Sequence, residues 1–156
     1  MAIEKVKEYF RQYGIDHQIQ EFDVSSATVN EAAIALNTEG KRIAKTIAFR
    51  YFDQTLLIVC AGDAKIDNSK YKSQFNLKAR MLNFEETELS VGHAVGGVCP
   101  FALNSNCVVV LDESLKRFKT VFPACGSGNS AIELSIDELI KYSKSTQWVD
   151  VCKEWK

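Results

Sequence analysis

The chain has 156 residues, 46% of them hydrophobic, and a formal net charge of −1. This length and apolar content suit one domain over 1–156, and the near-neutral charge excludes a general attraction to nucleic acid. The longest apolar runs have the length of a strand, so no membrane span is expected. The first residues are amphipathic and partly acidic, unlike a signal peptide, so we expect a cytoplasmic protein.

The first half of the chain predicts helices interspersed with extended segments. In order, these are a helix over 2–13, a strand over 18–23, a helix over 28–36, strands over 43–52 and 54–61, a helix from 67 or 68 to 75, and a strand over 78–82. Thr28-x-x-Glu31 is a capping box, which fixes the start of the second helix. The strand over 54–61 is apolar on both faces, so we expect it at the centre of a sheet.

The second half predicts further short elements around a glycine-rich loop. They are a helix opened by Asn83-x-x-Glu86, a strand over 107–111, a helical turn capped by Asp112, strands over 118–122 and 131–134, a helix opened by Ser135-x-x-Glu138, and a strand over 148–151. Tight and helical connections are mixed, which indicates an α+β fold with a mixed or largely antiparallel sheet. No strand leads through G-x-G-x-x-G into a helix, so a dinucleotide-binding fold has no support.

The cysteines do not suggest a disulfide framework or a zinc site. They number five, without a C-x-x-C pair, at positions 60, 99, 107, 125 and 152. Three lie in apolar strand-like runs and are expected to be buried. Cys99 and Cys125 adjoin glycine- or proline-containing loops, and either is a candidate nucleophile with His93 as its base. We expect no metal and no cofactor.

The loop that contains Gly96-Gly97-Val98-Cys99-Pro100-Phe101 fits neither a helix nor a regular strand. Paired glycines allow unusual backbone angles and close approach of another molecule, and Pro100 restricts Cys99 to an extended conformation. The N–H groups of Gly96, Gly97 and Val98 are therefore candidates to hold a carbonyl oxygen, an oxyanion or a phosphate. An ordinary structural turn is the alternative.

Lys45 lies at the entry of a strand, where it shares a face with Ile43 and Ile47. A lysine on an apolar face needs an anionic or polar partner, and in a cleft this partner would be a phosphate or carbonyl of a substrate. A lysine that points to solvent is the alternative. His93, at the start of the glycine loop, is either a general base or a hydrogen-bonding surface residue.

Three groups of basic residues interrupt the otherwise balanced charge. They are Lys41, Arg42 and Lys45; Lys65, Lys70, Lys72, Lys78 and Arg80; and Lys116, Arg117 and Lys119. If the three groups share a face, a polyanion of the size of an RNA can dock there. Ordinary solvated surface is the alternative.

Four motifs together resemble the YbaK/EbsC family, which is related to the editing domain inserted in bacterial prolyl-tRNA synthetases. They are Lys45-Thr46, Ala61-Gly62-Asp63, the loop from Gly96 to Phe101, and Gly126-Ser127-Gly128, and the resemblance runs from about 24 to 151. It implies a compact α+β fold with a curved, partly barrel-like mixed sheet flanked by helices. It also implies hydrolysis of the ester between a wrongly attached amino acid and the 3′ end of tRNA.

The resemblance also implies a set of site residues. The catalytic group is Lys45 with the backbone of Gly96, Gly97 and Val98, and Gly96 to Pro100 matches the family's G-x-x-x-P loop. The expected substrate-binding residues are Ser25, Ser26, Thr28, Thr46, Gly62, Asp63, His93, Pro100, Gly126 and Ser127. The loop over 122–129, which contains the Gly126-Ser127-Gly128 motif, has no histidine. The relatives in which the domain is inserted in a synthetase have a functional histidine there.

The expected reaction suits these residues, because an activated ester needs only a placed water and support for a developing oxyanion. The partners are then a mischarged tRNA, with tRNA-Pro as one candidate, and an aminoacyl-tRNA synthetase. A non-catalytic module that binds tRNA ends or a synthetase is the alternative, and a hydrolase that uses Cys99 or Cys125 is a third hypothesis.

Overall fold

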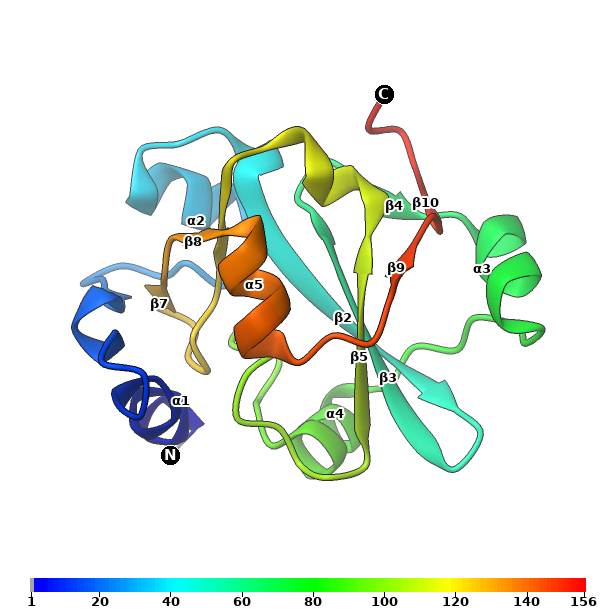
Figure 1. Ribbon diagram of the computed structural model, residues 1–156, viewed down its shortest axis with the longest axis horizontal. Helices are drawn as coiled ribbons and strands as arrows, with labels where there is room; N and C mark the ends of the chain where they lie inside the picture. The colour runs from blue at the N-terminus through cyan, green and yellow to red at the C-terminus, as the bar shows by residue number, and fades with distance from the viewer. Residues whose placement is uncertain (1) are drawn as a thin grey trace.

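A six-stranded mixed sheet forms the centre of the computed structural model, which describes residues 2–156 (Figure 1). Across the sheet the strands are β8 (Leu134–Ser135), β6 (Thr120–Pro123), β2 (Ile43–Tyr51), β3 (Gln54–Ala61), β5 (Cys107–Asp112) and β9 (Trp148–Val149). The pairs β2–β3 and β6–β8 are antiparallel, whereas β2–β6, β3–β5 and β5–β9 are parallel. The sheet curls into part of a barrel, so the predicted fold class is confirmed.

Short pairs and helices surround this sheet. β1 (Gln20–Glu21) pairs with β7 (Ser130–Ala131), and β4 (Lys65–Ile66) pairs with β10 (Cys152–Lys153). The helices are α1 (Ala2–Arg11), α2 (Val29–Leu36), α3 (Asn68–Phe75), α4 (Phe84–Val91) and α5 (Ile136–Ser143), with 3₁₀ turns η1 (Asp16–Gln18), η2 (Gly40–Arg42) and η3 (Glu113–Arg117). No helix within residues 2–156 is long and apolar enough to cross a membrane.

The helix starts follow the local sequence closely. Capping boxes open three helices, through Thr28 for α2, Asn83 for α4 and Ser135 for α5. In each box the side chain of the capping residue accepts from the backbone N–H of the glutamate three positions later, and that glutamate accepts from the capping residue's own N–H. Asp67 caps α3, accepting from Ser69 and Lys70. These contacts are local, so the sequence predicts them.

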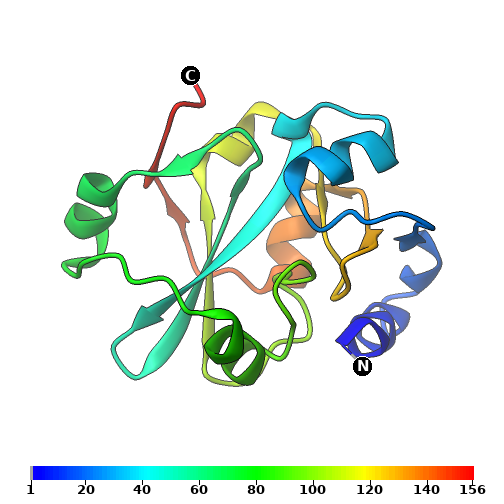
Figure 2. The ribbon, with the colours of Figure 1, turned by 180° about the vertical axis from the view of Figure 1, so that it is seen from behind.

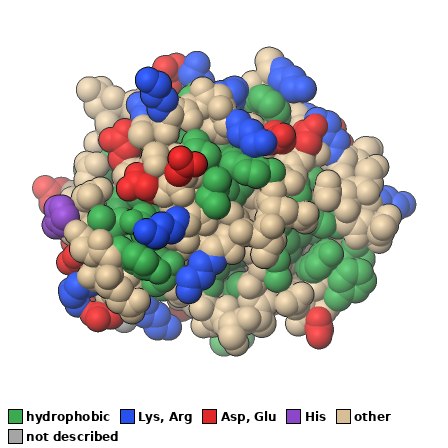
Figure 3. Space-filling view, in the orientation of Figure 1, with side chains coloured by type: hydrophobic (Ala, Val, Ile, Leu, Met, Phe, Trp, Pro, Cys, Tyr) green, Lys and Arg blue, Asp and Glu red, His purple; other side chains and the backbone are tan. Residues whose placement is uncertain are grey.

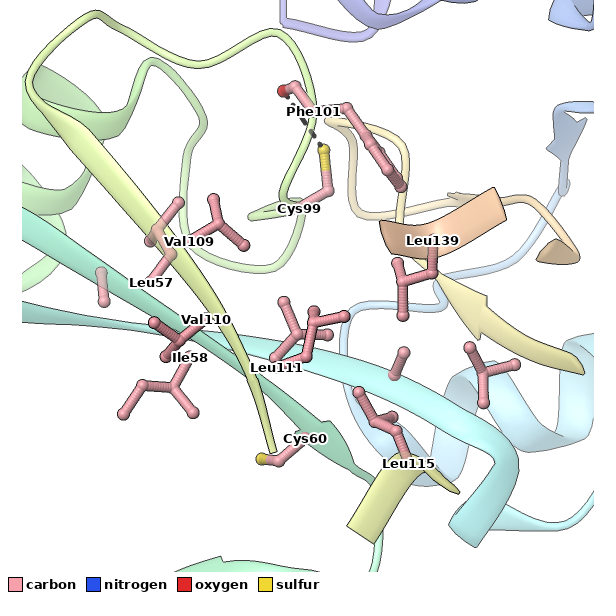
Figure 4. Close-up of a cluster of buried hydrophobic side chains, with 14 of the residues drawn as sticks. Leu57, Ile58, Cys60, Cys99, Phe101, Val109, Val110, Leu111, Leu115 and Leu139 are labelled. Carbon is pink, nitrogen blue, oxygen red and sulfur yellow. Dashed lines mark hydrogen bonds between the residues drawn. The ribbon is translucent and has the colours of Figure 1, made fainter. Parts of the chain in front are cut away.

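The core lies around β3, which is buried along all but its first residue. Figure 4 shows side chains of β3 and β5, such as Leu57 and Val110, packed with Leu115 from η3 and Leu139 from α5. Burial on both faces gives β3 its position between β2 and β5. The prediction of a central strand over 54–61 is confirmed.

Three predicted strands differ from the structure. Residues 78–82 run beside β2 but pair only through an isolated bridge between Met81 and Phe49, so no strand forms there. The predicted strand over 131–134 is two strands, because Ala131 pairs with β1 while Leu134 pairs with β6. The predicted strand over 18–23 is reduced to β1, since η1 occupies the first of its residues. Long-range partners decide the first two outcomes, whereas the third follows from a local turn.

Candidate functional site

A cavity of about 280 Å³ opens beside β2. Its walls come from the start of α2, the first six residues of β2, the segment that enters α4, the glycine loop, and the β6–β7 turn. Figure 2 shows α2, β2, α4 and the loop before β5 from the side opposite to Figure 1. Of the predicted site residues, those in the lining are Ser26, Thr28, Lys45, Thr46, Gly96 and Val98.

Lys45 is half-buried in β2 and is the one charged side chain among the described residues that line this cavity. Its Nζ donates to the carbonyl oxygen of Gly62 at 3.4 Å. Gly62 itself lies against the backbone of Gly40, since a Cβ placed on Gly62 would be 2.0 Å from the Gly40 carbonyl oxygen. Gly62 thus supports Lys45 from behind and does not line the cavity. The lining residues that the structure describes include no carboxylate, so the cavity favours anionic or neutral groups near Lys45.

The glycine loop reaches the cavity through Gly96 and Val98. Gly96 has φ +100°, and a Cβ there would be 3.2 Å from the Cβ of Ala27. Within residues 2–156 the N–H groups of Gly96 and Val98 have no hydrogen-bond acceptor. Gly97 corrects the prediction, because its N–H already donates to the Ala94 carbonyl oxygen at 3.0 Å and is not free for an oxyanion.

His93 is fully buried and does not line the cavity, contrary to its predicted contact with substrate. Its Nε2 donates to the carbonyl oxygen of Phe101 at 2.7 Å and lies 3.5 Å from the sulfur of Cys99. Desolvation lowers the pKa of His93, so the ring is neutral at pH 7. It ties the two ends of the glycine loop together.

The two candidate cysteine nucleophiles are also fully buried. Burial raises the pKa of Cys99 to about 12 and raises that of Cys125 as well. Figure 4 shows the Cys99 thiol directed at the Phe101 carbonyl, to which it donates at 3.8 Å. Both thiols are protonated and out of reach of a substrate, so the hypothesis of a cysteine-dependent hydrolase is wrong.

Four further predicted residues lie outside the cavity lining. Asp63 accepts two hydrogen bonds from Arg117, at 3.0 and 2.6 Å, and that hydrogen bonding lowers the pKa of its carboxyl. Ser25 donates to Glu31 Oε1 at 3.0 Å. Pro100 is buried in the wall of a separate hollow. Ser127 bonds to the neighbouring side chains of Asn129 and Ser130.

Gly126 has a structural role as well. Its φ is +93°, and a Cβ there would lie 3.0 Å from the backbone of Ala2 in α1. A Cβ on Gly97 would in turn lie 2.6 Å from the backbone nitrogen of Ser127. The glycine loop therefore packs directly on the late glycine turn, which packs on α1. These close contacts explain why glycines occur in both motifs.

Several lining residues were not expected from the sequence. Phe84 and Met81 lie at the cavity with largely exposed side chains, and Val95 precedes the paired glycines. Thr87 and Ser130 add hydroxyl groups to the lining. Phe84 directly follows the predicted helix cap Asn83, and an aromatic residue at the first position of a helix is the sequence signal that could have pointed to it.

Part of each basic group is paired with acids. Ion pairs join Lys41 to Glu39, Arg42 to Glu133, Lys70 to Asp150, Lys116 to Glu113, and Arg117 to Asp63. On the face in Figure 3, Lys and Arg side chains are interspersed with Asp and Glu. That face therefore has no uniformly basic surface. Residues 2–156 contain no group of three or more His, Cys, Asp or Glu placed to hold a metal ion.

The curled mixed sheet with its surrounding helices is also found in solved structures related to editing. The structure of a protein put forward as a trans-editing enzyme for prolyl tRNA synthetase superposes with a TM-score of 0.87, at 25% identity, over 97% of each chain. Residues 23–142 match the aminoacyl-tRNA editing domain family. The chain belongs to this family.

Two relatives extend this assignment. The chain is 52% identical to YwhH of Bacillus subtilis (strain 168), an uncharacterised protein, over the full length of both. It is 25% identical to a proline–tRNA ligase of Geobacillus sp. (strain WCH70) over 64% of this chain and 18% of the ligase. The prediction of membership in the editing family, related to a domain of prolyl-tRNA synthetases, is confirmed.

Proposed function

We propose that this protein is a trans-acting aminoacyl-tRNA deacylase, which removes a wrongly attached amino acid from the 3′ end of tRNA. The observation that carries the proposal is Lys45, the one charged side chain that residues 2–156 place in the cavity of a chain that belongs to the editing family. The relation to a proline–tRNA ligase supports tRNA-Pro as the substrate and a prolyl-tRNA synthetase as the partner. Such a substrate is used in the cytoplasm, where we place the protein.

The cavity suits each part of an aminoacyl ester. Its floor is apolar where Val29 and Ala32 of α2 meet Ile43 and Phe122. An uncharged side chain of the amino acid attached to the tRNA fits there. Lys45 attracts the terminal phosphate or the ribose oxygens of the nucleotide. The free N–H groups of Gly96 and Val98 donate to the oxyanion that develops on the acyl carbon.

The reaction needs no group beyond these and one water. The water oxygen attacks the acyl carbon, the bond from this carbon to the ribose oxygen breaks, and the ribose oxygen takes up a proton. The products are the free amino acid and tRNA with a free 3′ hydroxyl. Since the ester is already activated, placement of the water and support of the oxyanion supply most of the required acceleration.

Replacement of Lys45 tests the proposal. We expect Lys45→Ala to lower kcat/KM for release of amino acid from mischarged tRNA by about a hundredfold, because Lys45 is the one cation that the described residues place in the cavity lining. The measurement is the release of labelled amino acid from a panel of mischarged tRNAs. Lys41→Ala is the matched control, since Lys41 is an exposed lysine four residues away that does not line the cavity.

Two results contradict the proposal. One is the absence of release from every tRNA in the panel, and the other is full activity in Lys45→Ala. If the protein binds tRNA ends without turnover, the alternative of a non-catalytic binding module is correct instead.

A further inference from the structure

The outer edge of β2 is unpaired for a short stretch inside the cavity. On the side away from β3, β6 pairs with β2 only at Ile43 and Ala44. Further along, Leu82 donates to the Ala48 carbonyl oxygen at 3.1 Å. Between Ala44 and Ala48 no strand or bridge among the described residues pairs with this edge. The cavity occupies this gap, because its lining includes 43–48 on one side and the β6–β7 turn on another.

One residue directs its main-chain groups into the gap. The Ala48 carbonyl and the Arg50 N–H both bond to the 80–82 segment, so they point away from β3. The β2–β3 register runs without a bulge from the Ala44–Ala61 pair to the Tyr51–Gln54 pair. Main-chain groups alternate along a strand, so the N–H and C=O of Thr46 point to the same edge as those of Ala48.

Thr46 is also the hydroxyl residue in the lining without a partner. Its Oγ1 is buried and makes no hydrogen bond within residues 2–156. The hydroxyl groups of Thr28, Thr87 and Ser130 are engaged with other groups of the chain. An amino group that enters this cavity meets no carboxylate among the described lining residues, so the acceptors open to it at Thr46 are the hydroxyl Oγ1 and the main-chain carbonyl oxygen.

An α-aminoacyl group matches the main chain of a strand residue. Its amino nitrogen, α-carbon and acyl carbonyl follow in the same order as the N, Cα and C=O of a residue. Two residues that face each other in a hydrogen-bonded antiparallel pair exchange both N–H···O=C bonds. The open edge at Thr46 therefore has one acceptor and one donor at the spacing that an aminoacyl group requires.

We propose that Thr46 pairs through its main chain with the aminoacyl group of the substrate, as a β-bridge of one residue. The Thr46 carbonyl accepts from the α-amino group, and the Thr46 N–H donates to the acyl oxygen. This inference rests on the proposed function, because it takes an aminoacyl ester as the ligand. It assigns recognition of the α-amino group to the backbone, and so makes it independent of the amino acid's side chain.

The test compares ligands that differ only at the α-amino group. The probes are 3′-deoxyadenosine with an L-alanylamino group at the 3′ position and its analogue with a propionylamino group, which lacks the α-amine. Both are stable amides, so their affinities are measurable by calorimetry whether or not the protein turns over. We expect the L-alanyl compound to bind about tenfold or more tightly, the effect of one hydrogen bond to a charged donor.

A variant separates the main chain of Thr46 from its side chain. Thr46→Val keeps the branched shape and both main-chain groups but removes Oγ1. We expect it to keep the preference for the L-alanyl compound within about threefold, since the bridge uses no side-chain atom. Equal affinity of the wild-type protein for the two probes, or loss of the preference in a folded Thr46→Val protein, overturns the inference.

Two tRNA esters, one carrying an L-alanyl group and the other a propionyl group, distinguish this inference from the proposed function. Rates of release of alanine and propionate are each divided by the spontaneous hydrolysis rate of the same ester. Release of both at equal normalised rates overturns the bridge but leaves the deacylase intact. Release of no acyl group by the wild-type protein, with a preference retained in the binding measurement, overturns the deacylase but leaves the bridge intact.

Discussion

Three glycines lie so close to other backbone segments that a larger residue would displace them. A Cβ at Gly62, Gly97 or Gly126 would come within 3.0 Å of a backbone atom. Gly97 and Gly126 belong to the contact between the glycine loop and the late glycine turn. The role of these residues is the close approach of two backbones, whereas Gly96 and Val98 are the loop residues that reach the cavity.

The contact between the glycine loop and Ser127 predicts that activity depends more on Gly97 than on the thiol of Cys99. We expect Gly97→Val to lower kcat/KM for deacylation by about tenfold or more, because the added side chain pushes the loop off Ser127 and moves Gly96 and Val98. Cys99→Ser should change kcat/KM less, since the thiol is buried away from the cavity.

Gly14→Val is the control for this comparison. Gly14 has a positive φ, of +73°, which Gly97 does not, and a Cβ there has no atom within 4 Å, so valine at Gly14 brings backbone strain without a clash. Activity should be retained in this variant. A Gly97→Val protein as active as Cys99→Ser would show that the loop position does not matter for catalysis.

Among the elements, α2 is the helix that links a local sequence signal to the cavity. Its capping residue, Thr28, lines the cavity, as do Val29 and Ala32 from its first turns. α5 begins with the same kind of capping box at Ser135 but has no residue in the lining. The two helices therefore form a matched pair, alike in how they begin and different in what they contact.

The capping residues of the two helices, Thr28 and Ser135, should contribute alike to stability but differently to activity. Thr28→Ala and Ser135→Ala should each lower the free energy of unfolding by about 1 kcal/mol, because each removes an oxygen that accepts from the N–H three residues later. Urea unfolding measures this loss. Only Thr28→Ala should also reduce kcat/KM for deacylation. Equal loss of activity in the two variants would mean that general destabilisation, and not the wall of the cavity, is responsible.

At the scale of the whole molecule, we expect acid to lower stability through the buried side chain of His93. Desolvation lowers the pKa of His93 below the unfolded value of about 6.5, so the unfolded chain binds more protons than the folded one below that pH. The free energy of unfolding should therefore fall as the pH drops below about 6.5. Urea unfolding at several pH values between 5 and 7.5 measures this slope.

Exposed His17 provides the control for the pH experiment. A His17→Gln protein should keep the slope, whereas His93→Gln should flatten it in the window below about pH 6.5. A slope that is the same in His93→Gln as in the wild type would assign the acid sensitivity to other groups.

The parts of the fold that depend on neighbours in the sequence were predictable. The capping boxes of α2, α4 and α5 begin where their motifs indicate, and the apolar run of β3 lies at the centre of the sheet. The strand expected over 78–82 failed because its only partner, β2, lies about thirty residues away in the chain and contacts it at a single bridge.

The candidate site likewise contains residues that the sequence placed correctly and residues that it did not. Lys45, Thr46 and Gly96 lie at the cavity as their motifs suggest. Asp63 and His93 do not, because Arg117 and Phe101 bind them, and neither partner is visible from the residues that flank them. Polar residues near a motif are the least predictable part of a site, since a distant side chain or carbonyl decides which way they face.

An open strand edge usually carries a risk of self-association, because another chain can add a strand to it. In β2 the opening lies between a segment paired with β6 and a segment bonded to 80–82, and it is recessed in a cavity. A second strand of several residues cannot align there, whereas a ligand with one donor and one acceptor can. The length of the opening thus lets the protein keep unpaired backbone for recognition without a site for fibril growth.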